Sequence, residues 1–228
     1  MRILGLETST AVCSVGLFRE NEPGIERSMR ESHIHSEKLL TLVRDVLDRA
    51  AITPAQLDAI AVSIGPGSFT GLRIGLSTAK GLSFALGKPL VPVPTFEAIA
   101  VAAHQKSGTS QAVAVLMDAK KDEWYGGRFR LVNGMIQPDG PVHITTMGDA
   151  AASFIGIGPL LVLTDKVDEV KRSLDNAATI EDVHEYCRGD VVAGLARRRV
   201  ENQDFASASD LEPVYLKDFV VRTAPSAS

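Results

Sequence analysis

A glycine-rich segment at residues 65–75, Gly-Pro-Gly-Ser-Phe-Thr-Gly-Leu-Arg-Ile-Gly, constrains the fold of this chain more than any other feature. The apolar, β-branched run at residues 57–64 precedes it and predicts a buried strand. Helical periodicity then continues to Leu86, and Gly87 with Pro89 predicts the helix end. The glycines therefore lie at a strand-to-helix turn.

Such a turn has two possible uses. Backbone amides at a helix N-terminus point outward and favour an anion, so the segment could bind a phosphate. It lacks the Gly-Lys-Ser/Thr ending that places a lysine on a phosphate, and its glycine spacing differs from the dinucleotide fingerprint. Phosphate binding is therefore the weaker interpretation.

The helix that follows has a face almost without side chains. Gly71, Gly75, Ala79 and Ser83 recur every fourth residue, so a second helix could approach its backbone closely. This stripe favours either a helix from a partner or internal packing against the chain's own sheet, and the sequence leaves both open. On the partner interpretation, Gly75→Leu is expected to weaken association and leave the fold intact.

Composition limits the class of protein. The chain has 228 residues, of which 45% are hydrophobic and 23% charged, so it can bury an ample core without metals or disulfides. A formal net charge of −4 argues against a protein that binds nucleic acid without a partner. Cys13 and Cys187 are far apart and indicate neither a disulfide scaffold nor a zinc site. The N-terminal apolar run is too short for a signal peptide, and no segment is apolar enough to span a bilayer, so we expect a cytoplasmic protein.

The order of predicted elements indicates two successive α/β units of mixed sheet covered by helices. The first comprises strands at 3–6, 13–18, 24–31, 57–64 and 90–93 with helices at 36–51, 70–86 and 95–105. The second comprises strands at 112–117, 123–131 and 160–163 with helices at 148–154 and 191–200, and Asn133-Gly134 predicts a hairpin turn. We expect a first subdomain at residues 1–107, a reduced second subdomain at 108–220 and a disordered tail at 221–228.

Candidate catalytic groups are sparse. His33 and His35 lack a third nearby metal ligand, and His104, His143 and His184 are isolated. Ser63 and Ser68 do not match the nucleophile elbow of a hydrolase. The charged residues at 118–123 indicate a solvated hairpin loop, and the arginines at 197–199 suit a helix C-terminus. The residues therefore predict no catalytic or metal site.

Four motifs together resemble the bacterial TsaB (YeaZ) family in order and spacing. They are Leu-Gly-Leu-Glu-Thr-Ser at residues 4–9, the glycine-rich segment, Met-Asp-Ala-Lys at 117–120 and Glu-Pro-Val-Tyr-Leu-Lys at 212–217. The resemblance implies a duplicated actin-like ATPase fold (ASKHA, ribonuclease H-like) with the second unit reduced. It also implies a role with TsaD in making threonylcarbamoyladenosine at position 37 of tRNA.

The same resemblance implies that TsaD carries the chemistry. Where TsaD has two metal-binding histidines after its glycine-rich helix, this chain has Thr95 and Ile99, which suit no metal site. We therefore expect a non-catalytic subunit that docks TsaD, with a TsaE-type ATPase as a further partner and tRNA reached only through the complex. No cofactor is expected on this chain alone, although ATP could lie at the interface of the complex.

The expected partner surface lies on the helices at 36–51 and 70–86, and the same surface could form a homodimer. Its seven expected contact residues are Leu39, Val43, Val46, Gly71, Gly75, Ala79 and Ser83. The alternative is an enzyme, either a nucleotide-dependent phosphotransferase or a metalloprotease of the glycoprotease type. A kinase of this fold has an aspartate on its first hairpin, where this chain has Glu7.

Overall fold

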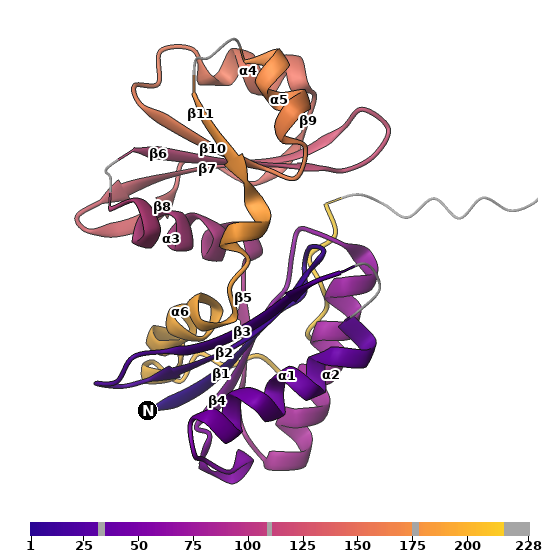
Figure 1. Ribbon diagram of the computed structural model, residues 1–228, viewed down its shortest axis with the longest axis vertical. Coiled ribbons are helices and arrows are strands. Elements are labelled where there is room, and N and C mark those ends of the chain that lie inside the picture. Colours follow the sequence, from indigo (N-terminus) through magenta and orange to yellow (C-terminus); the bar gives the residue numbers. More distant parts are fainter. Residues whose placement is uncertain (32–34, 109–110, 175–177, 217–228) are drawn as a thin grey trace, which may run out of the picture.

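The computed structural model describes residues 1–31, 35–108, 111–174 and 178–216, and contains two sheets of the same topology (Figure 1). The first sheet has the strand order β3-β2-β1-β4-β5 and the second β11-β10-β6-β7-β8, with β9 paired to β7. In each sheet, three antiparallel strands come first and two parallel strands follow on the other side. The duplication expected from the sequence is therefore confirmed at the level of topology.

The strands of the first sheet are β1 (Arg2–Glu7), β2 (Val12–Arg19), β3 (Ile25–Arg30), β4 (Ala59–Ser63) and β5 (Leu90–Val93). Those of the second are β6 (Ala112–Asp118), β7 (Trp124–Val132), β8 (Met135–Pro138), β9 (His143–Thr145), β10 (Leu160–Thr164) and β11 (Thr179–Asp182). The helices are α1 (His35–Arg49), η1 (Pro54–Gln56), α2 (Phe69–Leu86), α3 (Thr95–Ser107), α4 (Met147–Phe154), α5 (Val167–Ser173), η2 (Val183–Tyr186) and α6 (Gly189–Glu201).

The elements form five layers. Helices α1 and α2 cover the outer face of the first sheet, and α4 and α5 cover the outer face of the second (Figure 1). Helices α3 and α6 lie between the two sheets, where α6 packs on β1 and β2 and α3 packs on β6 and β8. The helix that follows each sheet in sequence therefore contacts the other sheet, and the halves on either side of residues 107 and 108 interlock.

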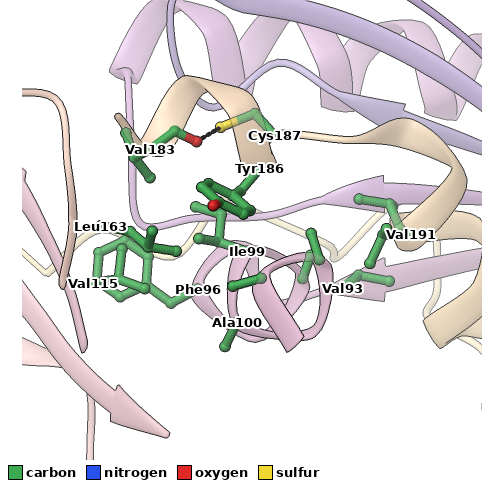
Figure 2. Close-up of a cluster of buried hydrophobic side chains, with 14 of the residues drawn as sticks. Val93, Phe96, Ile99, Ala100, Val115, Leu163, Val183, Tyr186, Cys187 and Val191 are labelled. Atoms are coloured by element: carbon green, nitrogen blue, oxygen red, sulfur yellow. Dashed lines mark hydrogen bonds between the residues drawn. The ribbon is translucent and has the colours of Figure 1, made fainter. Parts of the chain in front are cut away.

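The central layer is held by one apolar cluster that joins both sheets. Figure 2 shows Phe96 and Ile99 of α3 in this cluster, with Val93 of β5 and with Val115 and Leu163 of the second sheet. All five side chains are almost completely buried. Packing of this extent contributes roughly 1.5–3 kcal/mol for each large aliphatic side chain, so this layer is a major source of stability.

The structure locates the reduction of the second unit and adds elements that the sequence did not predict. The second unit retains a complete five-strand path, so its reduction lies in α4 and α5, which are much shorter than α1 and α2. The sequence also gave no signal for β9, α5, β11 or η2. Only Val170 is buried in α5, and β11 is short and polar, so neither has the periodicity on which such predictions depend. The expected tail at 221–228 lies outside the described residues.

Truncation of the central aromatic ring tests the layered core. Phe96→Ala should lower the free energy of unfolding by about 3–5 kcal/mol, because it leaves a cavity where both sheets meet. Phe84→Ala is the matched control, since the Phe84 side chain is 91% exposed and its loss should change stability by less than about 0.5 kcal/mol. Urea denaturation of both variants measures the difference, and equal losses would contradict this packing.

Candidate functional site

The face of α2 that carries the small-residue stripe packs against the turn between β1 and β2. The Thr8 hydroxyl donates a hydrogen bond to the Gly71 carbonyl oxygen at 2.8 Å. A Cβ atom on Gly71 would lie 2.1 Å from the Thr8 carbonyl oxygen, and one on Gly75 would lie 2.1 Å from Thr8 Oγ1. Both positions therefore require glycine because another part of the same chain fills the space.

The other expected contact residues are also used inside the chain. Ala79 is fully buried, and the Ser83 hydroxyl donates to the Lys88 carbonyl oxygen at 2.6 Å near the C-terminal end of α2. The three expected residues of α1 lie in the core beneath the first sheet, namely Leu39, Val43 and Val46. The structure thus places all seven residues on the inner faces of α1 and α2. The groove that the stripe suggested for a partner helix is occupied by the β1–β2 turn.

The opposite face of α2 is exposed and also built from small residues. Ser77, Gly81 and Ala85 recur every fourth residue, and a Cβ atom on Gly81 would meet no atom within 4 Å. Beside them, the Phe84 side chain is 91% exposed, which is unusual for a ring of this size. On the neighbouring helix α1, Leu40 is 60% exposed. We call Leu40, Ser77, Gly81, Phe84 and Ala85 the outer face.

Sequence reasoning missed the outer face, although a signal for it was present. The repeat of Ser77, Gly81 and Ala85 is offset by two positions from the stripe that begins at Gly71, so it lies on the other side of the helix. The sequence does not reveal which of two small-residue faces meets the protein's own sheet. The large aromatic residue Phe84 next to the outer repeat is the additional clue, because a ring there cannot also fill the core.

The N-terminal end of α2 is tied to the last described segment of the chain. The Arg73 guanidinium lies 3.8 Å from the centre of the Phe69 ring, and its Nε donates to the Tyr215 hydroxyl at 2.9 Å. The Phe69 and Tyr215 rings are 5.2 Å apart between centroids. The Val214 amide also donates to the Ile64 carbonyl oxygen at 2.7 Å. These contacts fix the position at which the outer-face helix begins.

Several backbone and hydroxyl groups of the glycine-rich loop bond within the chain. The Ser68 amide donates to the Ser9 carbonyl oxygen at 2.6 Å, and the Gly71 amide donates to Ser68 Oγ at 3.2 Å. The Gly65 amide donates to Thr95 Oγ1, and its carbonyl oxygen accepts from the Thr95 amide, both at 3.0 Å. The amides of Gly65, Ser68 and Gly71 are therefore not directed at a ligand.

Thr95 and Ile99 occupy the positions that correspond by resemblance to the metal-binding histidines of TsaD. Thr95 is fully buried and fixes the glycine-rich loop through the two hydrogen bonds just described. Ile99 is fully buried in the central apolar layer (Figure 2). These two residues thus serve packing and loop geometry.

Several of the remaining charged and histidine candidates have structural partners. Hydrogen bonds from Lys120 outweigh the opposing effect of burial and lower the pKa of Asp118. Arg197 pairs with Glu201, and Arg199 donates to the Pro92 carbonyl oxygen. His35 Nε2 lies 3.1 Å from the Val12 carbonyl oxygen. The partner histidine in that sequence motif, His33, lies outside the described residues.

A cavity of about 570 Å³ lies between the edge strand β3 and the segment before α6. Its two arginines are already paired, Arg30 with Asp182 and Arg188 with Asp190, both at 2.6–2.7 Å. Burial raises the pKa of the Cys187 thiol well above its ordinary value, so it remains a thiol at neutral pH. The cavity therefore offers no activated nucleophile from this cysteine.

The described residues contain neither a metal-binding cluster nor a membrane-spanning helix. No group of three or more histidine, cysteine, aspartate or glutamate side chains in that part of the chain is arranged to hold a metal ion. Within the same residues, no helix has both the length and the apolar character needed to cross a membrane.

The duplicated sheets and the interlocked central helices define the class of protein as the actin-like ATPase fold. The activator of 2-hydroxyisocaproyl-CoA dehydratase from Clostridium difficile shares this architecture, with a TM-score of 0.50 at 7% identity over 94% of the chain and all of the activator. A family model described as TsaD, tRNA N6-adenosine threonylcarbamoyltransferase, matches residues 29–153. The chain belongs to this family, and within it to the TsaB (YeaZ) proteins.

Curated and solved relatives agree with that assignment. The tRNA threonylcarbamoyladenosine biosynthesis protein TsaB of Escherichia coli is 34% identical over 132 residues, which are 57% of this chain and 55% of that protein. TsaB of Bacillus subtilis is 29% identical over 65% of this chain and 64% of its own length. The matched regions thus span between about half and two thirds of these relatives. YeaZ from Pseudomonas aeruginosa superimposes with a TM-score of 0.82 at 29% identity, covering 94% of this chain and 99% of that chain.

The two faces of α2 make a matched pair of tests. Gly75→Ala should destabilise the chain by about 1–3 kcal/mol, because the new methyl group would collide with Thr8. Gly81→Ala should stabilise it by about 0.5–1 kcal/mol, because the methyl group enters open space and alanine favours the helix. Thermal or urea unfolding reports both, and a neutral Gly75→Ala would contradict the packing against Thr8. The earlier expectation that Gly75→Leu spares the fold is wrong on this geometry.

Proposed function

We propose that this chain is a non-catalytic subunit of the machinery that makes threonylcarbamoyladenosine in tRNA. In this proposal it binds and activates the catalytic TsaD-type subunit through the outer face of α1 and α2. The names of its TsaB relatives support the pathway. The observation that supports this docking role most directly is the outer face, where the exposed Phe84 ring lies beside a repeat of small residues.

The chemistry of the outer face suits a helical partner. Small residues spaced every fourth position let a second helix approach the α2 backbone closely, and Phe84 supplies a large apolar group for a pocket on that helix. Isolated exposed apolar residues are common on protein surfaces, but a ring at 91% exposure beside such a repeat favours an interface. The internal contacts of the inner face support a docking role for the outer face, because they hold the backbone of α2 in place in the unbound chain.

The non-catalytic part of the proposal rests on how the expected catalytic positions are used. Thr95 and Ile99 serve loop geometry and core packing, and the amides of Gly65, Ser68 and Gly71 bond to the chain itself. Phosphoryl transfer needs groups that place metal and charge around a phosphate. The enzyme alternatives therefore have little support from these residues.

Other partners follow only from the family and stay predictions. They are a TsaE-type ATPase, tRNA contacted through the complex, ATP at the interface with TsaD, and a homodimer formed through α1 and α2. Calorimetry of the purified chain with ATP and Mg²⁺ separates the subunit from a phosphotransferase, since the proposal expects no heat of binding from the chain alone.

A charge on the outer face tests the docking surface. Phe84→Asp should weaken binding to the TsaD-type subunit of the same organism by about 30-fold, which corresponds to about 2 kcal/mol for loss of a central anchor. Ile155→Asp is the control, because Ile155 is 83% exposed but lies next to α4 on the second sheet. Titration calorimetry measures both affinities, and modification of tRNA in a reconstituted reaction should fall in parallel for Phe84→Asp alone. Equal affinities for both variants would place the interface elsewhere.

A further inference from the structure

Three buried oxygen atoms near the end of β1 lack a hydrogen-bond partner within the described protein. They are Glu7 Oε2, Ser9 Oγ and Ser63 Oγ. All three residues are fully buried. Unsatisfied buried polar atoms are rare in folded proteins, and each one calls for an explanation such as an ordered water or an ion.

The fold brings these three residues to one place. Strands β1 and β4 are parallel neighbours in which Leu6 pairs with Val62, so Glu7 and Ser63 are the next residues along and point to the same face. Ser9 joins them through the turn, where its amide donates to Glu7 Oε1 at 2.6 Å. The Ser9 and Ser63 hydroxyls both lie close enough to the Glu7 carboxyl group to lower its pKa.

The glycine-rich loop covers this cluster. A Cβ atom on Gly67 would lie 2.4 Å from the Ser9 carbonyl oxygen, so the loop backbone packs directly on the turn. The Ser68 amide donates to the same carbonyl oxygen at 2.6 Å. Glu7 therefore lies beneath the loop.

A negative charge at Glu7 would have no basic partner. Burial raises the pKa of Glu7, and the Ser9 amide together with the nearby hydroxyls of Ser9 and Ser63 opposes this effect without outweighing it. The other titratable groups that interact with it are thiols. Burial raises the pKa of Cys13 on β2 to about 11, and it also raises the pKa of Cys187 before α6. The charge of Asp182 also raises the pKa of Cys187, and the charge of Arg30 lowers it.

We propose that Glu7 Oε2, Ser9 Oγ and Ser63 Oγ surround an internal site for one water molecule, and that Glu7 lines this site as a neutral carboxylic acid. A neutral acid supplies one O–H donor and each serine supplies a hydroxyl, so a water with two donors and two acceptors satisfies all three oxygens. At any pH between the unfolded and the folded pKa of Glu7, folding then takes up a proton from solution onto this carboxyl group. The site is independent of the proposed docking function.

The proton at Glu7 makes stability depend on pH with a defined sign. The unfolded carboxyl titrates near 4.5 and the folded one titrates higher, so the folded state binds more protons between these two values. The contribution of Glu7 to the free energy of unfolding is fully present below about pH 4.5. It is lost as the pH rises through the pKa of Glu7 in the folded state. Over this interval the unfolding equilibrium constant should increase by up to tenfold per pH unit.

Replacement by the isosteric amide tests the neutral acid. Glu7→Gln keeps an oxygen for the Ser9 amide and supplies N–H donors, so it should be more stable than the wild type at pH 8 and should lose this pH dependence. Glu31→Gln, at an exposed glutamate, should leave the pH dependence unchanged. Denaturation of the three proteins across pH 4–9 provides the comparison. A Glu7→Gln variant that is less stable than the wild type at pH 8 would indicate an ionised Glu7 and overturn the proposal.

Two measurements on the wild-type chain do not depend on whether a variant folds. Nuclear magnetic resonance of glutamate labelled with ¹³C at the carboxyl carbon should show Glu7 titrating well above 4.5, and titration at or below 4.5 would contradict the neutral acid. A high-resolution crystal structure should show one water within hydrogen-bond distance of all three oxygens. A cation at that position, or a site closed by direct bonds between Glu7 and Ser63, would refute the water site.

Discussion

The β1–β2 turn and helix α2 approach so closely that no side chain larger than hydrogen fits between them at Gly71 and Gly75. Thr8 fills that space and bonds to the helix backbone. The contact fixes α2 against the first sheet, closes the glycine-rich loop over the turn, and places Glu7 in the interior. The outer face and the buried polar cluster both follow from this single approach of two backbones.

This contact changes what the glycine-rich segment does in the actin-like fold. Backbone amides at a strand-to-helix turn can bind phosphate groups when they are free. Here the turn meets α2 instead, and Ser9 accepts the Ser68 amide where a ligand could otherwise bind. The same architecture therefore presents a rigid helix to the outside, which suits a protein that binds another protein.

Sequence reasoning went furthest where the pattern is local. The periodicity around β4 and α2, the meander at the start of each unit and the Asn133-Gly134 turn each depend on neighbouring residues, and the structure has all of them. The stripe at Gly71 was read correctly as a face of close approach. The stripe does not predict which element packs against it, because Thr8 is 63 residues away from Gly71 in the chain. The burial of Glu7 depends on β1, β4 and the loop together, so no short pattern could reveal it.

The central claim is that α1 and α2 use their inner faces for this chain and leave the outer face for a partner. Methyl cross-saturation in the complex with the TsaD-type subunit tests it most directly, because it reports contact with the partner one side chain at a time. We expect saturation of the Leu40 and Ala85 methyl groups and none at Leu39, Val46 or Ala79. Saturation of the buried three, or of no methyl group on either helix, would contradict it.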